Sequence, residues 1–257
     1  MPDRLHIHVP YGSLRDTLPF LLERRLQPEI AFRGPDLDAG GIGDLDDYGA
    51  RLAAAGLAVT VHAPFHDLNP GALEPLVRDV TARRCRQTLE AAARLGARLV
   101  VFHPGFDRWK YGGQDHLWLE RNLTFWPPLL DTARQAGIVV TLENIFEPRP
   151  ETLRRLLRAL DCPHFGHCFD VGHWRLFADV PLDEWFGALG PWIRHLHLHD
   201  NRGRADEHLP VGEGEIDFGA LFTQVGALPQ PVSMTLEAHE REALLRSLAA
   251  VAPFLGR

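Results

Sequence analysis

Residues 87–105 read QTLEAAARLGARLVVFHPG and contain a complete helix-to-strand transition. Ala, Leu and Arg in the first half favour a helix, and Gly96 follows where a left-handed C-terminal cap is expected. The β-branched, apolar run Arg98–His103 then has the composition of a buried strand, and it ends on a polar side chain. The same order recurs in residues 129–143, LLDTARQAGIVVTLE, with Gly137 before the strand. The repeating unit of this chain is therefore a helix, a glycine and a strand.

The alternation continues in both directions from this stretch. Eight apolar, β-branched segments are predicted strands: Leu5–Val9, Glu29–Phe32, Ala58–His62, Arg98–His103, Val139–Glu143, His164–Asp170, Ile193–His199 and Val232–Glu237. The segments between and after them have helical patterns: Leu14–Arg25, Leu45–Ala55, Leu73–Leu95, Leu117–Ala136, Glu151–Leu160, Leu182–Leu189, Phe218–Val225 and Arg241–Phe254. Strand then helix, eight times without a linker, predicts one α/β domain over residues 1–257, a (β/α)8 TIM barrel. An open doubly wound sheet is the alternative, but no Gly-rich phosphate fingerprint follows any predicted strand.

The bulk composition excludes several classes of protein. Hydrophobic residues make up 45% of the 257 residues, enough for a large core, and no run approaches the roughly 20 apolar residues of a membrane span. The first residues lack a basic segment followed by an apolar one, so we expect a cytoplasmic protein. Three cysteines without a CxxC pattern argue against a disulfide framework.

The charge of the chain argues against nucleic acid as a partner. The formal net charge is −7, so the chain as a whole has no attraction for a phosphate backbone. Lys110 is the only lysine, and nothing in the sequence around it suggests Schiff-base chemistry.

Polar residues gather where the predicted strands end. Their identities are those of metal ligands: His62, His103, Glu143, Asp170 with His173 just after it, His197 and Glu237. The seventh strand, RHLHLHD, carries further histidines at period two. In a TIM barrel the C-terminal strand ends form the active site, so we expect these side chains to converge there.

A shared metal ion accounts for this convergence. A buried carboxylate or imidazolium costs several kcal/mol unless it is paired or metal-bound. Imidazole nitrogen and carboxylate oxygen together form the ligand set of zinc, manganese or iron(II). One histidine at a strand end is more often a hydrogen-bonding core residue, and Glu143 alone could pair with an arginine, but neither explanation covers six strand ends. We expect His8 and His195 to be non-ligands.

The motifs FDVGHW, HLHLHDN and DEHLPVGEG carry a family resemblance. The sequence resembles the xylose isomerase-like TIM-barrel superfamily, which includes endonuclease IV and sugar-phosphate isomerase/epimerase-like proteins, from about His62 to Glu237. Endonuclease IV holds three zinc ions with nine side chains, and each position has a match here. The resemblance implies that His62, His103 and Glu143 hold the first metal. It also implies a second metal, held by Glu143, Asp170, His197 and Glu237. The third metal would be held by His173, Asp206 and His208.

The sugar epimerases of the superfamily imply a smaller site. Glu143, Asp170, His197 and Glu237 match their single-metal ligands, and the two glutamates would also be the catalytic acid and base. The loop RGPDLDAGG differs from endonuclease IV, because Asp36 stands where a basic DNA-binding loop is expected. The resemblance therefore does not imply DNA repair.

Four functions follow as hypotheses. The first is a hydrolase with one to three zinc ions, acting on a phosphoester or another small polar substrate, with Arg33, Arg202 and Arg204 as candidate anion contacts. The second is a sugar or sugar-phosphate isomerase or epimerase that uses one Zn²⁺, Mn²⁺ or Mg²⁺, with Glu143 and Glu237 as acid and base. The third is an amide or ester hydrolase of a secondary pathway, and the fourth is a non-catalytic metal or ligand carrier. We favour the first function because of the number of candidate ligands. The expected partner is a small-molecule substrate, phosphorylated or sugar-like. The sequence makes no prediction of the oligomeric state.

Overall fold

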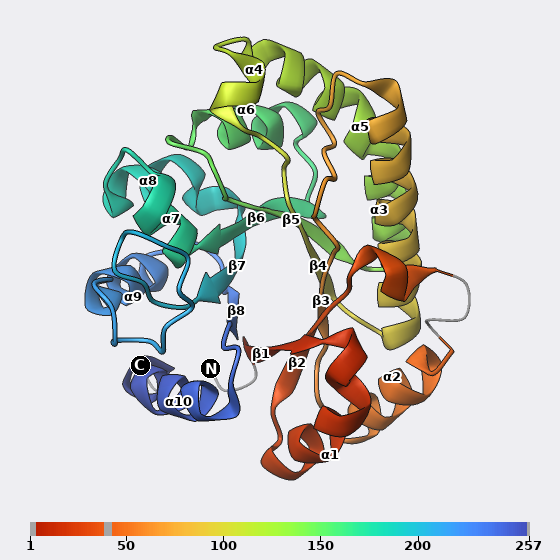
Figure 1. Cartoon of the computed structure of the whole chain (residues 1–257), viewed down its shortest axis with the longest axis vertical. Coiled ribbons are helices and arrows are strands. Elements are labelled where there is room, and N and C mark those ends of the chain that lie inside the picture. Colours follow the sequence, from red (N-terminus) through yellow and green to blue (C-terminus); the bar gives the residue numbers. More distant parts are fainter. Residues whose placement is uncertain (1–3, 39–42, 256–257) are drawn as a thin grey trace.

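The computed structural model describes residues 4–38 and 43–255, and it contains a closed barrel of eight parallel strands in sequence order (Figure 1). The strands are β1 (Leu5–Pro10), β2 (Gln27–Ala31), β3 (Thr60–His62), β4 (Leu99–Phe102), β5 (Val139–Glu143), β6 (Phe165–Asp170), β7 (Ile193–Leu198) and β8 (Ser233–Leu236). The predicted TIM barrel is confirmed. Two segments used in the sequence analysis lie outside the described residues. They are residues 1–3, at the start of the chain, and residues 39–42, at the end of the acidic loop.

Helices surround the barrel on its outside (Figure 1). The eight predicted helices are observed as α1 (Leu14–Arg24), α2 (Leu45–Ala54), α3 (Pro75–Leu95), α5 (Asp115–Gln135), α6 (Glu151–Leu160), α8 (Leu182–Leu189), α9 (Phe218–Gly226) and α10 (Arg241–Leu255). Two short helices, α4 (Arg108–Tyr111) and α7 (Val171–Phe177), were not predicted. Both lie between a strand and the next long helix, so they are part of the loops at the C-terminal end of the barrel.

Local sequence accounts for the way the helices end. Gly96 follows α3 with a φ of 67°, and Gly137 precedes β5 with a φ of 69°. Only glycine adopts this left-handed conformation without a steric penalty, and the chain can then turn sharply into the next strand.

The register of the strands places the polar residues at one level of the barrel. Asp170 of β6 pairs with His197 of β7, which in turn pairs with Thr235 of β8. Because the strands are parallel, their C-terminal ends meet at the same rim, and the side chains that follow them are brought together.

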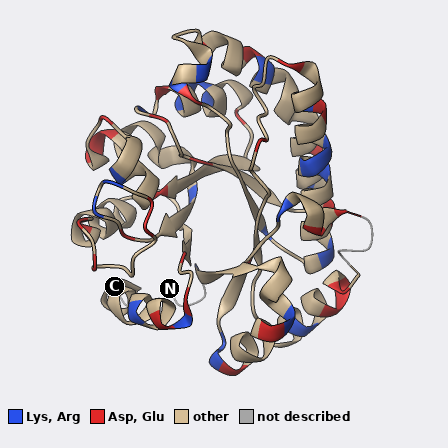
Figure 2. Cartoon of the chain, viewed as in Figure 1, with Lys and Arg blue, Asp and Glu red and all other residues tan. Residues whose placement is uncertain are grey.

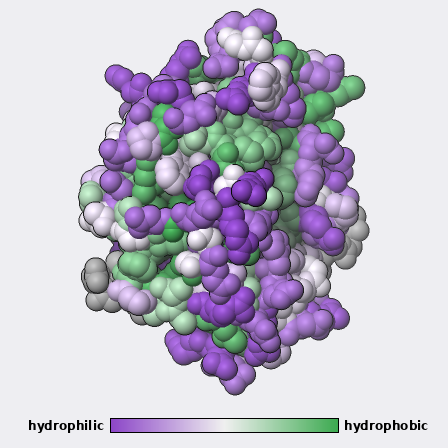
Figure 3. Space-filling view, turned by 60° about the vertical axis from the view of Figure 1, so that its left-hand side comes forward, coloured by the Kyte–Doolittle hydropathy of each residue, from purple (hydrophilic) through white to green (hydrophobic). Residues whose placement is uncertain are grey.

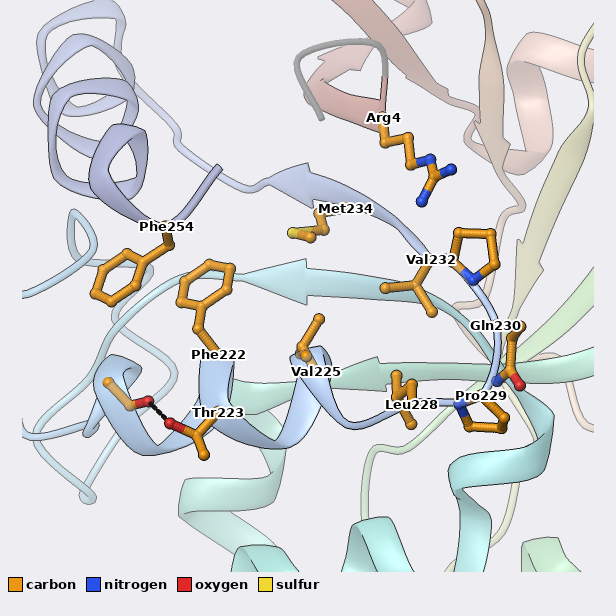
Figure 4. A pocket seen from close by; sticks show the side chains of 13 residues that line it. Arg4, Phe222, Thr223, Val225, Leu228, Pro229, Gln230, Val232, Met234 and Phe254 are labelled. Atoms are coloured by element: carbon orange, nitrogen blue, oxygen red, sulfur yellow. Dashed lines mark hydrogen bonds between the residues drawn. The ribbon is translucent and has the colours of Figure 1, made fainter. Parts of the chain in front are cut away.

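A cavity of about 670 Å³ lies outside the strands, between β8, α9 and α10, and extends to the residues that precede β8 and β1 (Figure 4). Its lining is mostly apolar and includes Phe222, Leu228, Met234 and Phe254. It shares no side chain with the polar rim. Among the described residues, no helix is long and apolar enough to cross a membrane.

Candidate metal centre

Glu143 is the side chain around which the C-terminal rim is arranged. Its Oε2 lies 3.2 Å from His62 Nε2, 3.4 Å from His103 Nε2 and 3.3 Å from His197 Nδ1. Its other oxygen, Oε1, lies 3.0 Å from His173 Nδ1. The two carboxylate oxygens therefore contact different histidines, as a carboxylate that bridges two cations would.

A second group is centred on His197. Its Nδ1 lies 3.3 Å from Glu237 Oε1 and 3.7 Å from Asp170 Oδ2. Asp170 also caps the short helix α7, because its Oδ1 accepts a hydrogen bond of 2.6 Å from the backbone N–H of His173. The FDVGHW motif thus orients one carboxylate and one imidazole together.

The third group comes from the loop after β7. Asp206 Oδ2 lies 3.3 Å from His173 Nε2 and 3.2 Å from His208 Nε2. His208 Nδ1 lies 3.6 Å from Glu237 Oε2, so this group adjoins the second one. The structure therefore brings together all nine side chains that the sequence singled out, while their role as ligands stays a prediction.

The electrostatics of the cluster are those of ionised carboxylates among imidazoles. Burial alone would raise the pKa of Glu143, but His197 and His103 outweigh it and hold that pKa well below its usual range. Burial opposes the charged form of His173, yet Asp170 and Asp206 raise its pKa well above the ordinary value. A site that keeps its carboxylates ionised while buried is suited to a cation.

Several buried nitrogens of the cluster have no hydrogen-bond partner among the described residues. They include His197 Nδ1, His208 Nδ1 and His199 Nδ1, besides His197 Nε2 and His8 Nδ1. An unpartnered buried nitrogen costs about 1–3 kcal/mol unless something binds it. The donor set fits divalent metal ions, since each of these nitrogens lies beside a carboxylate.

Two buried residues at the site were given no role from the sequence. His199 has Nε2 3.1 Å from Asp170 Oδ2, and its ring stacks on that of His208 at a centroid distance of 4.0 Å. Glu29 of β2 is fully buried beneath His197. The signal for Glu29 was a charged residue inside an apolar strand, and that for His199 was the period-two pattern of RHLHLHD.

The expected non-ligands lie at the edge of the cluster or below it. Both ring nitrogens of His195 are hydrogen-bonded, Nδ1 with the Ser233 hydroxyl at 2.6 Å and Nε2 with that of Thr235 at 2.9 Å. His8 Nδ1 lies 3.8 Å from Glu237 Oε1, too far for a hydrogen bond, and has no other partner among the described residues. His195 is thus a hydrogen-bonded core histidine, while the role of His8 as a non-ligand stays a prediction.

The candidate anion contacts are exposed and partly paired. Arg33 lies 3.4 Å from Asp36, and Arg202 lies 2.7 Å from Glu207. Arg204 is exposed. None of these contacts supports a dedicated anion site, although all three side chains belong to loops at the rim.

Aromatic rings border the cluster on two sides. Phe65, 39% exposed, stacks on His103 with a centroid distance of 4.2 Å. Phe177 lies 6.3 Å from the His173 ring and 5.0 Å from Phe146. Apolar surface therefore adjoins the polar cluster, as in many small-molecule sites.

Charges of both signs are interspersed over the outer helices (Figure 2). Several form ion pairs, such as Arg84 with Asp38 at 2.6 Å and Arg94 with Asp46 at 2.7 Å. The face turned forward in Figure 3 is largely hydrophilic, with smaller hydrophobic patches between. This distribution, like the net charge, does not resemble a basic DNA-binding face.

Comparison with known proteins agrees with this barrel. The family model described as a xylose isomerase-like TIM barrel matches residues 25–253. The chain belongs to the xylose isomerase-like TIM-barrel family. The resemblance read from its motifs is thus confirmed, and known members include epimerases, isomerases and endonuclease IV.

The family relatives include both uncharacterized proteins and nucleases. Two uncharacterized proteins of Methanocaldococcus jannaschii are similar. MJ1311 is 35% identical over 168 residues, covering 62% of this chain and 57% of that protein. MJ1614 is 31% identical over 216 residues, covering 80% of this chain and 79% of that protein. A probable endonuclease 4 of Mycobacterium leprae is 30% identical over 193 residues, covering 70% of this chain and 73% of that protein.

Two solved structures of the family superpose over nearly the whole chain. One is a D-tagatose 3-epimerase-like protein, 26% identical with a TM-score of 0.85, covering 98% of this chain and 97% of that one. The other is the TTHB071 protein of Thermus thermophilus after soaking with ZnCl2, 29% identical with a TM-score of 0.82, covering 98% of each chain.

Proposed function

We propose that the chain is a hydrolase with a multinuclear zinc centre, acting on a phosphoester or another small polar substrate. The observation that carries the proposal is the convergence of four residues that a one-metal isomerase would not need. They are His62, His103, Asp206 and His208, and each lies within 3.4 Å of Glu143 or of another member of the cluster. The endonuclease 4 relatives support the same reading, because the resemblance to endonuclease IV assigns all four as ligands.

The charge of the cluster also supports more than one metal ion. Four carboxylates converge at the rim, Glu143, Asp170, Asp206 and Glu237, and a fifth, Glu29, is buried just below. One divalent cation balances the charge of two carboxylates, so the others would have to be balanced by protonated imidazoles. Two divalent cations balance the charge of four carboxylates. Buried charge that is not compensated costs several kcal/mol, so the larger number of ions is favoured.

The residues divide into those that hold metal and those at the entrance. When bound, divalent metals would supply Lewis acidity and a water of lowered pKa. Glu143 separates the His62–His103 side of the cluster from the His173 side, and its two oxygens keep them at a fixed spacing. Asp206 has a side chain 38% exposed and is the most accessible of the four carboxylates, so we place the entrance beside it. Phe65 and Phe177 border the cluster on its flanks.

The test is the metal content of protein purified without added metal. We expect two to three zinc ions per chain by plasma mass spectrometry. His62→Ala and His208→Ala should each lower this number and the hydrolysis of phosphodiester, phosphomonoester and amide substrates. His116→Ala, an exposed histidine of α5, is the matched control and should change neither. Full metal content and turnover in both cluster variants would contradict the proposal.

A sugar epimerase is the second candidate, and the D-tagatose 3-epimerase-like structure favours it. In this alternative Glu143, Asp170, His197 and Glu237 would hold one Mn²⁺, Mg²⁺ or Zn²⁺, and the glutamates would exchange a proton at carbon. One metal ion per chain, together with exchange of a sugar C–H proton with deuterated solvent, would establish this function. Without such exchange across a panel of ketoses and their phosphates, the epimerase is excluded.

A further inference from the structure

Glu29 is a buried carboxylate in the middle of β2, directly below the cluster. Its side chain is completely inaccessible to solvent. The Oε2 atom accepts hydrogen bonds from the hydroxyls of Thr60 at 3.1 Å and Thr235 at 3.0 Å. Burying an ionised carboxylate in this way costs several kcal/mol unless neighbouring groups compensate its negative charge.

Two histidines of β7 lie against this carboxylate. His195 Nε2 is 3.0 Å from Glu29 Oε2, and His197 Nε2 is 2.9 Å from Oε1. His195 has hydroxyl partners for both ring nitrogens and is not one of the nine candidate ligands, although its ring lies 5.4 Å from that of His197. Among the nine, His197 is the one whose ring nitrogen Glu29 contacts directly.

The two nitrogens of His197 face opposite environments. Nε2 lies 2.9 Å from Glu29 Oε1, whereas Nδ1 lies 3.3 Å from both Glu143 and Glu237, and neither nitrogen has a hydrogen-bond partner among the described residues. A neutral imidazole carries one proton, and Glu29 is the carboxylate nearest to the ring. With Glu143 and Glu237 bound to a metal ion, Glu29 would be the one left to attract this proton, to Nε2. Nδ1 is then left with its lone pair directed at the rim, as a metal ligand requires.

We propose that Glu29 is a positioning residue that fixes the orientation and tautomer of His197, so that Nδ1 is presented to the metal centre. The inference rests on the proposed function, because it concerns a ligand of that centre. It names a residue outside the nine that the resemblance supplies. Glu29 belongs to the second strand, which contributes none of those nine.

One alternative use of the same residues is a deeper cation site. Cys168, His195 and His197 have ligand atoms within 4.8 Å of one another. His195, however, has both nitrogens hydrogen-bonded, so it would have to break a bond to Thr235 or Ser233 to bind an ion. The positioning role leaves every one of these hydrogen bonds in place.

The experiment compares zinc affinity in four proteins by competition with a chromophoric chelator. Glu29→Gln keeps the shape of the side chain and removes its charge, and we expect zinc binding about 10- to 100-fold weaker. At saturating zinc its stoichiometry should equal that of the wild type, because every ligand remains, whereas His197→Ala should bind fewer zinc ions. Glu29→Asp, which retains the charge, should recover part of the affinity. The cobalt(II)-loaded Glu29→Gln protein should show an altered ligand-field spectrum.

Gln27→Ala is the matched control for stability. Gln27 lies on the same strand and is hydrogen-bonded to Leu5 and Ala58, at the end of β2 away from the cluster. It should lower the unfolding temperature and leave zinc affinity unchanged. If Glu29→Gln behaved in the same way, Glu29 would be structural only and the inference would be wrong. Loss of one zinc equivalent in Cys168→Ala would also overturn it, in favour of the deeper site. A wild-type chain that binds no zinc would contradict the proposed function and this inference together.

Discussion

Glu147 illustrates how burial alone can change the chemistry of one residue next to the cluster. It is 1% exposed, its Oε2 accepts a hydrogen bond from the backbone of Ile145, and its Oε1 has no partner among the described residues. Burial raises the pKa of Glu147 from 4.5 to about 8, so the folded chain holds this carboxyl protonated at neutral pH. Glu143, four residues earlier, is held ionised by the surrounding imidazoles. Two glutamates only four residues apart thus differ in charge, because only Glu143 has imidazoles in direct contact.

The raised pKa of Glu147 predicts a pH-dependent cost in stability. Between pH 4.5 and about 8 the folded state retains a proton that the unfolded state has released, so stability falls by about 1.4 kcal/mol per pH unit. Glu147→Gln removes this dependence and keeps an acceptor for Ile145. Urea denaturation in the presence of a metal chelator measures the effect. The unfolding free energy of the Glu147→Gln protein should exceed that of the wild type by an amount that grows from pH 5 to 8 and vanishes near pH 4. Glu151→Gln, at the exposed start of α6, is the control. A gain that is independent of pH would contradict the prediction.

Gly172 predicts a second effect at the residue scale. A Cβ at this position would overlap the imidazole of His199, which lies beside Asp170. Gly172→Ala should therefore cost about 1–3 kcal/mol of stability and lower zinc affinity, because His199 must move against the cluster. Gly187→Ala, in α8 with open space around it, should instead stabilise by about 0.5–1 kcal/mol. Thermal unfolding and chelator competition measure both, and equal behaviour of the two variants would contradict the argument.

At the scale of elements, the loop after β7 depends on one buried carboxylate. Asp200 accepts hydrogen bonds from the backbone N–H groups of Asn201, Gly212, Gly214 and Ile216, at 2.8–3.1 Å. This cage closes the segment that carries Asp206 and His208. The third group of candidate ligands is therefore held in part by the Asp200 side chain, beside the backbone bridge between Asp200 and Leu209.

Removal of the Asp200 carboxylate should destabilise the loop after β7. Asp200→Ala leaves four N–H groups without their acceptor, which should cost at least about 2 kcal/mol. It should also lower the zinc content and speed tryptic cleavage at Arg202 and Arg204. Asp217→Ala is the control, because it removes only the cap of α9, worth about 1 kcal/mol. Unchanged zinc content and cleavage in Asp200→Ala would show that the loop is held in another way.

The elements were largely predictable because their signals are local. Glycine after a helix and apolar runs between helices indicated all eight strands, although β3 is shorter than predicted and starts at Thr60 rather than at Ala58. The helix α7 was missed because seven residues carry too little periodicity to recognise. Glu29 and His199 were missed for a different reason. Glu29 contacts β7 and His199 contacts β6. These contacts join residues far apart in the sequence, and a local sequence pattern contains no information about them.

At the scale of the whole molecule, the polar cluster and the mostly apolar cavity lie in separate parts of the barrel. The cluster at the C-terminal rim is buried and rich in carboxylates, while the cavity lies outside the strands, between β8, α9 and α10. A cation at the rim would stabilise the entire fold, because six of the eight strands end beside it.

Metal removal should therefore lower the stability of the whole chain. A ligand that binds only the folded state at 100 times its Kd adds about 2.7 kcal/mol, which corresponds to a rise in Tm of roughly 5–10 °C for a chain of this size. Zinc should raise the Tm by this amount above its value in chelator, as measured by calorimetry. Glu143→Gln should reduce the rise, because Glu143 contacts the histidines of both halves of the cluster. The exposed-histidine variant His116→Ala should retain it in full. A Tm equal in zinc and in chelator would mean that the cluster is stabilised by its own ion pairs, and that the convergence of carboxylates and imidazoles does not reflect a metal centre.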